Sequence, residues 1–155
     1  MSRAHRPVSR RRRDESGTAI VEFVWLAILL MVPLLYILIA VFDTQRTAYA
    51  ASAAARSAGR AFVTSPDQRT AYARAETAAR LAFTDQGLGA VPMTLRITCR
   101  PNPSACLSPG SVVTAEVRSS AALPLVPRVL GHNRPRIRVE SVHSAPYGTF
   151  HEARP

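Results

Sequence analysis

An uninterrupted apolar run, Phe23 to Phe42, constrains what this chain can fold into more than any other part of its sequence. Its 20 residues carry no charge and are rich in Leu, Ile and Val. As an α-helix the run would rise about 30 Å, the thickness of the hydrocarbon layer of a bilayer. A helix of a soluble core would keep a polar face, which this run lacks. We therefore predict one transmembrane helix over residues 18–42, kinked at Pro33 because proline removes a backbone hydrogen bond.

Arginines precede this run and predict its orientation. All 20 basic residues of the chain are arginine, and the net charge is +10. Six of them fall in the first 13 residues, including the cluster Arg10, Arg11, Arg12 and Arg13. Basic residues beside a membrane helix tend to stay on the cytoplasmic side. We expect residues 1–17 to be a basic cytoplasmic leader of a single-pass protein of the cell membrane, with everything after Phe42 extracytoplasmic.

Two other targeting signals fit parts of this region less well. Thr47 to Ala50 offers a site like that of a removable secretory signal, and the arginines are similar to those of a twin-arginine export signal. However, the apolar run is much longer than the core of a signal peptide, and Asp43 and Arg46 intervene before Ala50. Acids and Gly17 follow the arginines where an export signal has apolar residues. A membrane helix therefore remains the main interpretation.

The positive charge also raises the question of nucleic-acid binding. Beyond Phe42, the remaining 14 arginines are scattered among seven acidic residues. They are not interleaved with aromatic residues on a soluble face, as a surface that binds nucleic acid would require. We expect no nucleic-acid partner, and recovery of the chain in the soluble cytosol would revive that hypothesis.

Cys99 and Cys106 are the only cysteines, and both lie in the part expected outside the membrane. They enclose a turn-rich segment with two prolines and an asparagine, and stretches with strand character flank them at residues 93–98 and 112–118. An oxidising compartment favours a disulfide that closes this hairpin. The alternatives are two unrelated thiols or half of a zinc site. Zinc needs four ligands, and His132 and His143 have no supporting motif.

Between the apolar run and the hairpin the composition predicts two helical segments. Residues 43–64 are alanine-rich without proline, so we expect the membrane helix to extend outward. Small side chains in this extension would let another helix approach closely, although helix propensity alone also explains them. These residues are Ala50, Ala51, Ser52, Ala54, Ala55, Ala58 and Gly59.

A second, amphipathic helix is expected within residues 65–89. We predict Ser65 as its N-cap, Pro66 at its first helical position, and an end near Thr84 before the glycines that follow. Its apolar stripe is weak, and we expect that stripe to pack on the first helix or on a sheet. The stripe consists of Tyr72, Ala75, Ala79, Ala82 and Phe83.

The remaining residues are expected to form strands and turns. Residues 90–144 are predicted to be a small β-rich head with the disulfide hairpin and a third strand, Arg136 to Ser144, under one helix. Residues 145–155 are expected to be a loose tail. The predicted fold class is membrane-anchored α+β, with a long N-terminal transmembrane helix that extends outward, a second helix and a small C-terminal antiparallel sheet.

No catalytic motif is present in the sequence. It lacks a nucleophile elbow, a Walker loop, an H-E-x-x-H zinc motif and a glycine-rich dinucleotide turn. The four histidines are far apart in the sequence, and the acids of the second helix are spaced as solvent-facing residues. We therefore expect no enzymatic activity, no cofactor and no metal.

One acidic residue, Glu22, stands where the chain is expected to enter the membrane. A carboxylate at the centre of a membrane helix costs about 2.5–3.5 kcal/mol on insertion scales and usually marks a function or a partner. Alternatively, Glu22 lies near the interface, where it is hydrated or favoured by the N-terminal helix dipole. The residue on its own does not decide between these interpretations.

The segment Gly17-Thr18-Ala19-Ile20-Val21-Glu22-Phe23 lies after a basic leader and before an unbroken apolar helix. It resembles the processing site of type IV pilin-like proteins, and most specifically that of the TadE-like minor pseudopilins of Tad/Flp pilus systems. The stretch Ala54 to Arg60 also resembles the small, arginine-bearing stretch of that family. The resemblance covers residues 10–62, and the head matches in general character alone.

The resemblance implies a processing step and a mode of assembly. A prepilin peptidase would cut after Gly17 and leave Thr18 as the new N-terminus, with a largely protonated amine near neutral pH. Glu22 would then pair with the amine of a neighbouring pilin-like subunit and set the register between subunits, with Phe23 beside it. Major pilins of this branch usually carry Tyr after the glutamate and are much shorter, which favours a minor subunit.

Two hypotheses of different classes follow. The first is a structural, non-enzymatic TadE-like pseudopilin that takes part in pilus assembly, with the membrane, a prepilin peptidase and other pilin-like subunits as its partners. The second is an uncleaved single-pass membrane protein whose extracytoplasmic head binds a ligand or a partner. N-terminal sequencing separates them, because a chain that starts at Thr18 supports the first.

Overall fold

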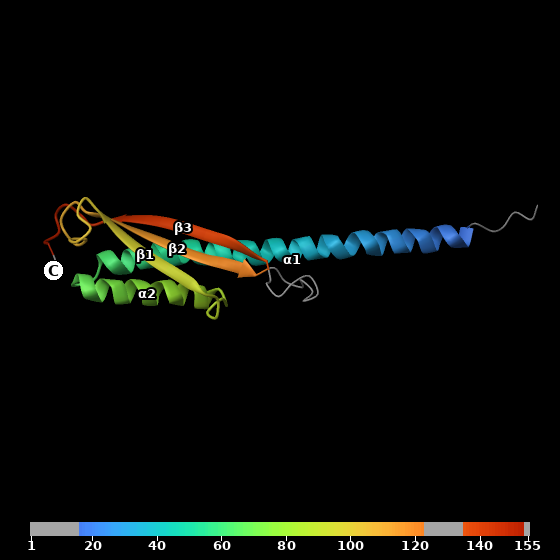
Figure 1. Cartoon of the computed structure of the whole chain (residues 1–155), viewed down its shortest axis with the longest axis horizontal. Helices are drawn as coiled ribbons and strands as arrows, with labels where there is room; N and C mark the ends of the chain where they lie inside the picture. Colours follow the sequence, from blue (N-terminus) through green and yellow to red (C-terminus); the bar gives the residue numbers. More distant parts are fainter. Residues whose placement is uncertain (1–15, 123–134, 154–155) are drawn as a thin grey trace, which may run out of the picture. The chain divides into compact units, whose positions relative to one another are not determined.

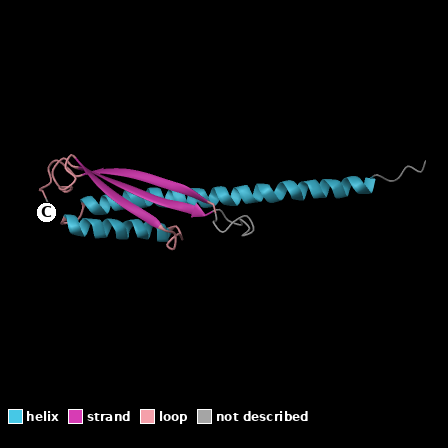
Figure 2. Ribbon diagram, viewed as in Figure 1, coloured by secondary structure: helices cyan, strands magenta, loops and turns pink. Residues whose placement is uncertain are grey.

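The computed structural model describes residues 16–122 and 135–153, and its elements follow the order α1, α2, β1, β2, β3 (Figures 1 and 2). The chain divides into two compact units, one ending at Ile37 and the other beginning at Leu38. Helix α1 contributes its first part to one unit and its remainder to the other. The predicted leader arginines, Arg10 to Arg13, lie outside the described residues.

Helix α1 runs from Ser16 to Val63, so the expected membrane helix and its extension form one continuous element. Pro33 lies inside it. The most apolar part of this helix is not buried, and by length and composition alone it suits a membrane span. The long helix was predictable because neither glycine nor a second proline interrupts the alanine-rich segment before Gly59.

Helix α2, Gln68–Asp85, begins two residues later than the predicted Pro66 because its N-cap is Asp67 and not Ser65. The Asp67 carboxylate accepts hydrogen bonds from the Thr70 backbone N–H at 2.8 Å and the Thr70 hydroxyl at 2.7 Å. The backbone bond is the main reason that the pKa of Asp67 lies below its usual value. The Ser65 hydroxyl is engaged elsewhere, since it donates to the Ala61 carbonyl at the end of α1.

The buried face of α2 differs from the predicted stripe by one residue. Ala71 is fully buried in place of Tyr72, which is 43% exposed. Tyr72 instead stands at the edge of the core, where its ring meets that of Phe62 edge to face, with centroids 5.1 Å apart. The other predicted members, Ala75, Ala79, Ala82 and Phe83, are buried as expected.

Three antiparallel strands form the sheet in the order β1-β2-β3. Strand β1 is Met93–Arg100, β2 is Val112–Ala122 and β3 is Arg136–Pro146. All three expected strands are confirmed, and each extends beyond its predicted end. Residues that pair across two strands point to the same face of the sheet. The register pairs Arg118 with Glu140 on one face and Val117 with Ser141 on the other.

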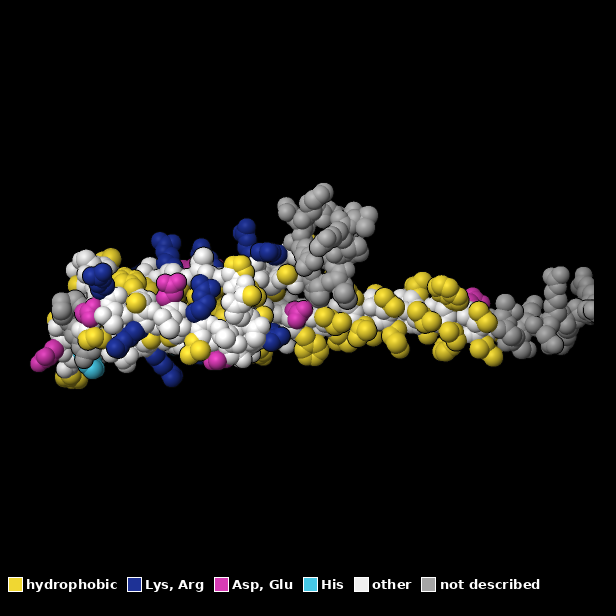
Figure 3. Space-filling model, turned by 90° about the horizontal axis from the view of Figure 1, so that it is seen from below, with side chains coloured by type: hydrophobic (Ala, Val, Ile, Leu, Met, Phe, Trp, Pro, Cys, Tyr) yellow, Lys and Arg dark blue, Asp and Glu magenta, His cyan; other side chains and the backbone are white. Residues whose placement is uncertain are grey.

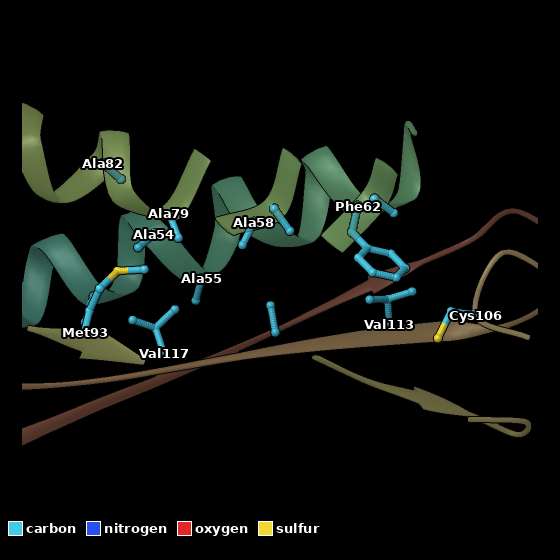
Figure 4. Close-up of a cluster of buried hydrophobic side chains, with 14 of the residues drawn as sticks. Ala54, Ala55, Ala58, Phe62, Ala79, Ala82, Met93, Cys106, Val113 and Val117 are labelled. Atoms are coloured by element: carbon cyan, nitrogen blue, oxygen red, sulfur yellow. The ribbon is translucent and has the colours of Figure 1, made fainter. Parts of the chain in front are cut away.

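The core lies between the inner face of the sheet and two helices, where one helix had been expected (Figure 4). Both α2 and the second part of α1 contribute rows of small side chains, which meet larger residues such as Val113 and Val117 from the sheet. In α1 the fully buried members are Ala50, Ala51, Ala54, Ala55, Ala58 and Phe62. The small residues of α1 therefore serve packing within the chain.

Gly59 marks a close approach of α1 to β3. A Cβ atom at this position would lie 3.3 Å from Cδ2 of His143 and 3.4 Å from Cβ of Ala145. Both distances are tight, and the Ala145 Cβ is fixed to the backbone of β3. The missing side chain thus lets α1 lie directly on β3.

Arg46 joins α1 to the end of α2. Its Nε donates a hydrogen bond to the carbonyl of Gln86, the C-cap of α2, at 2.6 Å. A cation at this end also complements the helix dipole. Gly87 follows with a positive φ of 67°, and a Cβ there would meet the Arg46 guanidinium. Glycine is needed at position 87 for both reasons.

Cys99 and Cys106 form the expected disulfide, with their Cα atoms 5.3 Å apart. Cys99 is the seventh residue of β1 and pairs in register with Val113, whereas Cys106 lies in the connecting loop. The bond therefore closes the loop onto the end of β1 and does not join the two strands of the hairpin.

The segment expected to be a loose tail begins with ordered structure. Strand β3 continues to Pro146, and Tyr147 is only 2% exposed. The Tyr147 backbone N–H donates to the carbonyl of Ser111 at 2.8 Å, and its hydroxyl donates to the carbonyl of Glu152 at 2.7 Å. These bonds hold residues 145–152 to the loop that precedes β2.

Candidate functional site

The first part of α1 exposes an unusually continuous apolar surface (Figure 3). Every large hydrophobic side chain that the structure exposes between residues 20 and 37 is at least 48% accessible, and Phe23 reaches 74%. Monomeric soluble proteins rarely expose apolar patches larger than a few hundred Å². By its length and composition, this part of α1 could cross a membrane.

Glu22 and Phe23 lie on a shallow groove in this surface. The groove is lined by Ala19, Glu22, Phe23, Leu26, Ala27 and Leu30. These residues form two rows with a spacing of four, one of which is Ala19, Phe23 and Ala27. Rows with this spacing are the ridges that interdigitate when two helices pack, and the space between them accepts a ridge of a partner. The two predicted assembly residues, Glu22 and Phe23, thus both line one groove of α1.

Glu22 is the only charged residue between Ala19 and Phe42. Its side chain is exposed, and among the described residues it makes no hydrogen bond or ion pair. In water this needs no partner, but among apolar helices a lone carboxylate is costly. A partner that covers the groove would therefore have to bring a positive charge or a hydrogen-bond donor to this position.

The predicted processing site lies at the very beginning of α1. Gly17 and Thr18 belong to the first turn of the helix, which starts at Ser16. The first backbone N–H groups of a helix have no partner within it, and helix ends fray readily. This position is compatible with access by a peptidase, which would need the local helix to open.

A second candidate lies at the disulfide loop. An open hollow there is lined by Ile97, Thr98, Cys99, Arg100, Pro101, Pro103, Gly110 and Val112. Its walls combine prolines and apolar side chains with the Arg100 guanidinium. The disulfide joins the loop beside this hollow to β1.

The outer face of the sheet carries most of the head's strand charges. Arg118 pairs with Glu116 on its own strand and with Glu140 on β3, where its Nε lies 3.1 Å from the carboxylate. The buried oxygen of Glu116 is the one that contacts Arg118, so the ion pair compensates its burial. Arg96, Arg136 and Arg138 are exposed on the same face.

Metal binding finds no support in the described part of the chain, residues 16–122 and 135–153. No three His, Cys, Asp or Glu side chains come together there in a way that could hold an ion. His143 lies against α1 at Gly59, and the ring of His151 lies 5.1 Å from that of Tyr147. His132 lies outside the described residues.

Comparisons with protein-family models, curated proteins and solved structures find no match to this chain. The site must therefore be interpreted from its own residues. Sequence reasoning predicted the disulfide but missed Arg46, whose partner lies 40 residues further along the chain. The assembly roles of Glu22 and Phe23 stay predictions. It also missed the burial of Tyr147, whose backbone N–H bonds to the carbonyl of Ser111, 36 residues earlier.

Proposed function

We propose that the chain is a single-pass membrane protein that acts as a minor, TadE-like pseudopilin in the assembly of a Tad/Flp-type pilus. The observation that carries the proposal is the exposed apolar surface of α1 with one carboxylate, Glu22, in its helix-packing groove. The basic leader and the Gly17–Thr18 junction before it give the sequence order that a prepilin peptidase uses.

The physical role of Glu22 follows from its surroundings. Cleavage after Gly17 would create an ammonium group at Thr18, four residues before Glu22. A neighbouring subunit that packs along the groove would bring its own ammonium to this carboxylate. In a low-dielectric bundle, leaving either charge alone is strongly unfavourable, so the pair would fix the axial register of the two helices.

The burial of the alanine rows narrows the surface that can serve assembly. Ala50 to Ala58 were expected to admit a second helix, and their fully buried members already pack against α2 and the sheet of the same chain. The proposal therefore assigns contact with other subunits to the groove near Glu22. The head would remain a preformed unit on the outer side.

The first test concerns membrane insertion and processing. We expect the chain to stay in the membrane after alkaline extraction, because nothing within residues 16–122 and 135–153 covers the apolar surface of α1. N-terminal sequencing of the membrane-resident product should begin at Thr18, and Gly17→Ala should slow or block that cut. An unprocessed product with the arginine leader still attached would rule out the pseudopilin role.

The second test concerns register. Glu22→Ala should leave insertion and processing intact but abolish pilus assembly, whereas Glu76→Ala should have no effect. Glu76 is a suitable control because it is an exposed glutamate on α2, away from the groove. Normal piliation in the Glu22→Ala strain would contradict the proposed pairing.

A second function has one observation in its favour. The hollow at the disulfide loop would suit an uncleaved membrane protein whose head binds a partner or an envelope component. Under this hypothesis the leader remains attached, and the mature mass includes residues 1–17. Intact mass spectrometry therefore decides between the two functions.

A further inference from the structure

Three exposed arginines, Arg46 on α1 and Arg136 and Arg138 on β3, gather at one end of the head. We call them the basic rim. Strand β3 and α1 run side by side in the same direction (Figures 1 and 2), and Gly59 of α1 touches His143 of β3. This contact is a common reference point, from which distances along α1 and along β3 can both be measured.

The comparison places the rim close to the end of the apolar run. Arg136 precedes His143 by seven residues, or about 23 Å of strand. About 23 Å of helix corresponds to roughly 15 residues, which leads from Gly59 back to the level of Thr44. Arg46 lies four residues beyond Phe42, or about 6 Å along the helix. Arg136 thus lies about 3 Å beyond Phe42, and Arg138 about 7 Å further.

These levels match the headgroup layer of a bilayer. If Phe42 ends the hydrocarbon span, the polar layer next to it is roughly 5–7 Å thick. Arg46 and Arg136 fall within this layer, and the long side chain of Arg138 can reach back to it. Guanidinium groups form bidentate hydrogen bonds with phosphate and are attracted to anionic lipid surfaces.

We propose that the basic rim binds the headgroups of anionic phospholipids in the outer leaflet and so holds the head against the membrane. The inference rests on the membrane crossing of α1 that is part of the proposed function, but not on cleavage or pilus assembly. The kind of partner is a lipid surface that carries phosphate groups with a net negative charge.

The contacts of the arginines separate the rim from the rest of the sheet. Arg118 is held by Glu116 and Glu140, whereas Arg136 and Arg138 have no hydrogen bond or ion pair within residues 16–122 and 135–153. Arg46 uses its Nε for Gln86 and keeps its remaining guanidinium N–H groups for other acceptors. Asp43 is the one acidic residue at this level of α1 and reduces the net charge of the rim without cancelling it.

Arg96 and Arg100 provide a matched control. They lie on the same outer face, also on an edge strand, and both are exposed. Arg100 is level with Val112 and Pro146, so it lies ten residues of β3, or about 33 Å, from Arg136. At this distance it is beyond the headgroup layer, and its removal changes the total charge without touching the rim.

A local fluorescent reporter can test the proposal in the full-length chain. Ala122→Cys places a single free thiol directly opposite Arg136, because the two native cysteines are joined. The labelled chain is reconstituted into vesicles of pure phosphatidylcholine or with about one third phosphatidylglycerol. Quenching of the reporter by a headgroup nitroxide lipid measures how close this end of the head lies to the membrane.

We expect quenching to rise at least twofold with phosphatidylglycerol at low salt and to return toward the phosphatidylcholine value in about 1 M salt, where the Debye length is roughly 3 Å. The double variant Arg136→Gln/Arg138→Gln should lose this rise, and Arg96→Gln/Arg100→Gln should keep it. Equal quenching in the two kinds of vesicle, or equal loss in both double variants, would overturn the inference. The arginine leader is the same in all variants and does not affect the comparison.

Alkaline extraction of the same vesicles distinguishes the two ways in which the idea can fail. A chain that is washed out lacks the membrane crossing, and both the inference and the proposed function are then wrong. A chain that resists extraction but shows no dependence on lipid charge refutes the basic rim alone. Arg136 and Arg138 are exposed, so their replacement leaves the core of the head unchanged. Arg136→Lys/Arg138→Lys should restore the rise.

Discussion

Phe62 offers the most direct test of how the head is held together. It is the largest aromatic residue that α1 contributes to the core, it is fully buried, and its ring meets Tyr72 of α2 edge to face. Phe62→Ala removes the ring and leaves a cavity between α1, α2 and β2. Such a deletion costs about 3–5 kcal/mol. Of this, about 0.5–1.5 kcal/mol belongs to the ring pair itself.

The measurement is thermal unfolding of the full chain in mild detergent, followed by the near-ultraviolet circular dichroism of its tyrosines. For a unit of this size a loss of 3 kcal/mol lowers the Tm by more than about 10 °C. The matched control is Phe150→Ala, because Phe150 is fully exposed and its deletion should change stability by less than about 0.5 kcal/mol. A Tyr72→Ala variant and the double variant complete a cycle that isolates the ring contact.

Two results would refute this reasoning. If Phe62→Ala and Phe150→Ala lowered the Tm equally, Phe62 would not be the core residue that its burial indicates. If the effects of Phe62→Ala and Tyr72→Ala were simply additive, the edge-to-face contact would contribute nothing beyond the area it buries.

Three further predictions concern the caps and the cross-link. Cys99→Ala/Cys106→Ala should lower the free energy of unfolding by about 2–3 kcal/mol, the chain-entropy value for a loop closed over a separation of seven residues, as measured by urea titration with and without reductant. Gly87→Ala should lower the free energy of unfolding by about 1–2 kcal/mol because φ is positive there. The new Cβ should also break the Arg46–Gln86 hydrogen bond, which faster hydrogen exchange at the end of α2 would show. An unchanged exchange rate would argue against this contact. Asp67 should make stability depend on pH: its folded pKa is lowered, so its contribution is complete above the unfolded pKa of about 3.9 and is lost as the pH falls through the lower folded value. Asp67→Asn should remove this part of the pH dependence, and a stability profile identical to that of the parent chain below pH 4 would contradict it.

The elements that the sequence predicted well are those defined by local patterns. The apolar run and the alanine-rich segment predict α1 from composition alone. The strands follow from alternation, as in Arg136 to Ser144, where more and less exposed residues alternate from Arg138 onward. The cysteine pair followed from its spacing and its turn-rich enclosure. In the candidate site, Glu22 and Phe23 were selected from the sequence, and both line one groove of α1. Their role in assembly stays a prediction.

The errors have a common cause in contacts between distant segments. Ser65 is as good an N-cap by type as Asp67, but its hydroxyl is already bonded to the end of α1. Tyr72 and Ala71 differ by one position on the helix, and only the crossing of α1 and α2 decides which is buried. Tyr147 is ordered by the Ser111 carbonyl, 36 residues earlier, and no local pattern indicates that bond. The basic rim was likewise hidden, because it depends on how β3 aligns with α1.

The buried alanine rows limit which amino-acid substitutions this head can accept. At Ala54, Ala55 or Ala58 every replacement except glycine adds atoms to a space that two helices and a sheet already fill. Enlargement strains such a core, whereas trimming to glycine costs mainly backbone entropy. A comprehensive substitution scan should therefore show these positions accepting only the smallest residues, while Val113 and Val117 across from them accept a wider range of apolar side chains. The helix residues and the sheet residues of one core would then accumulate substitutions at different rates.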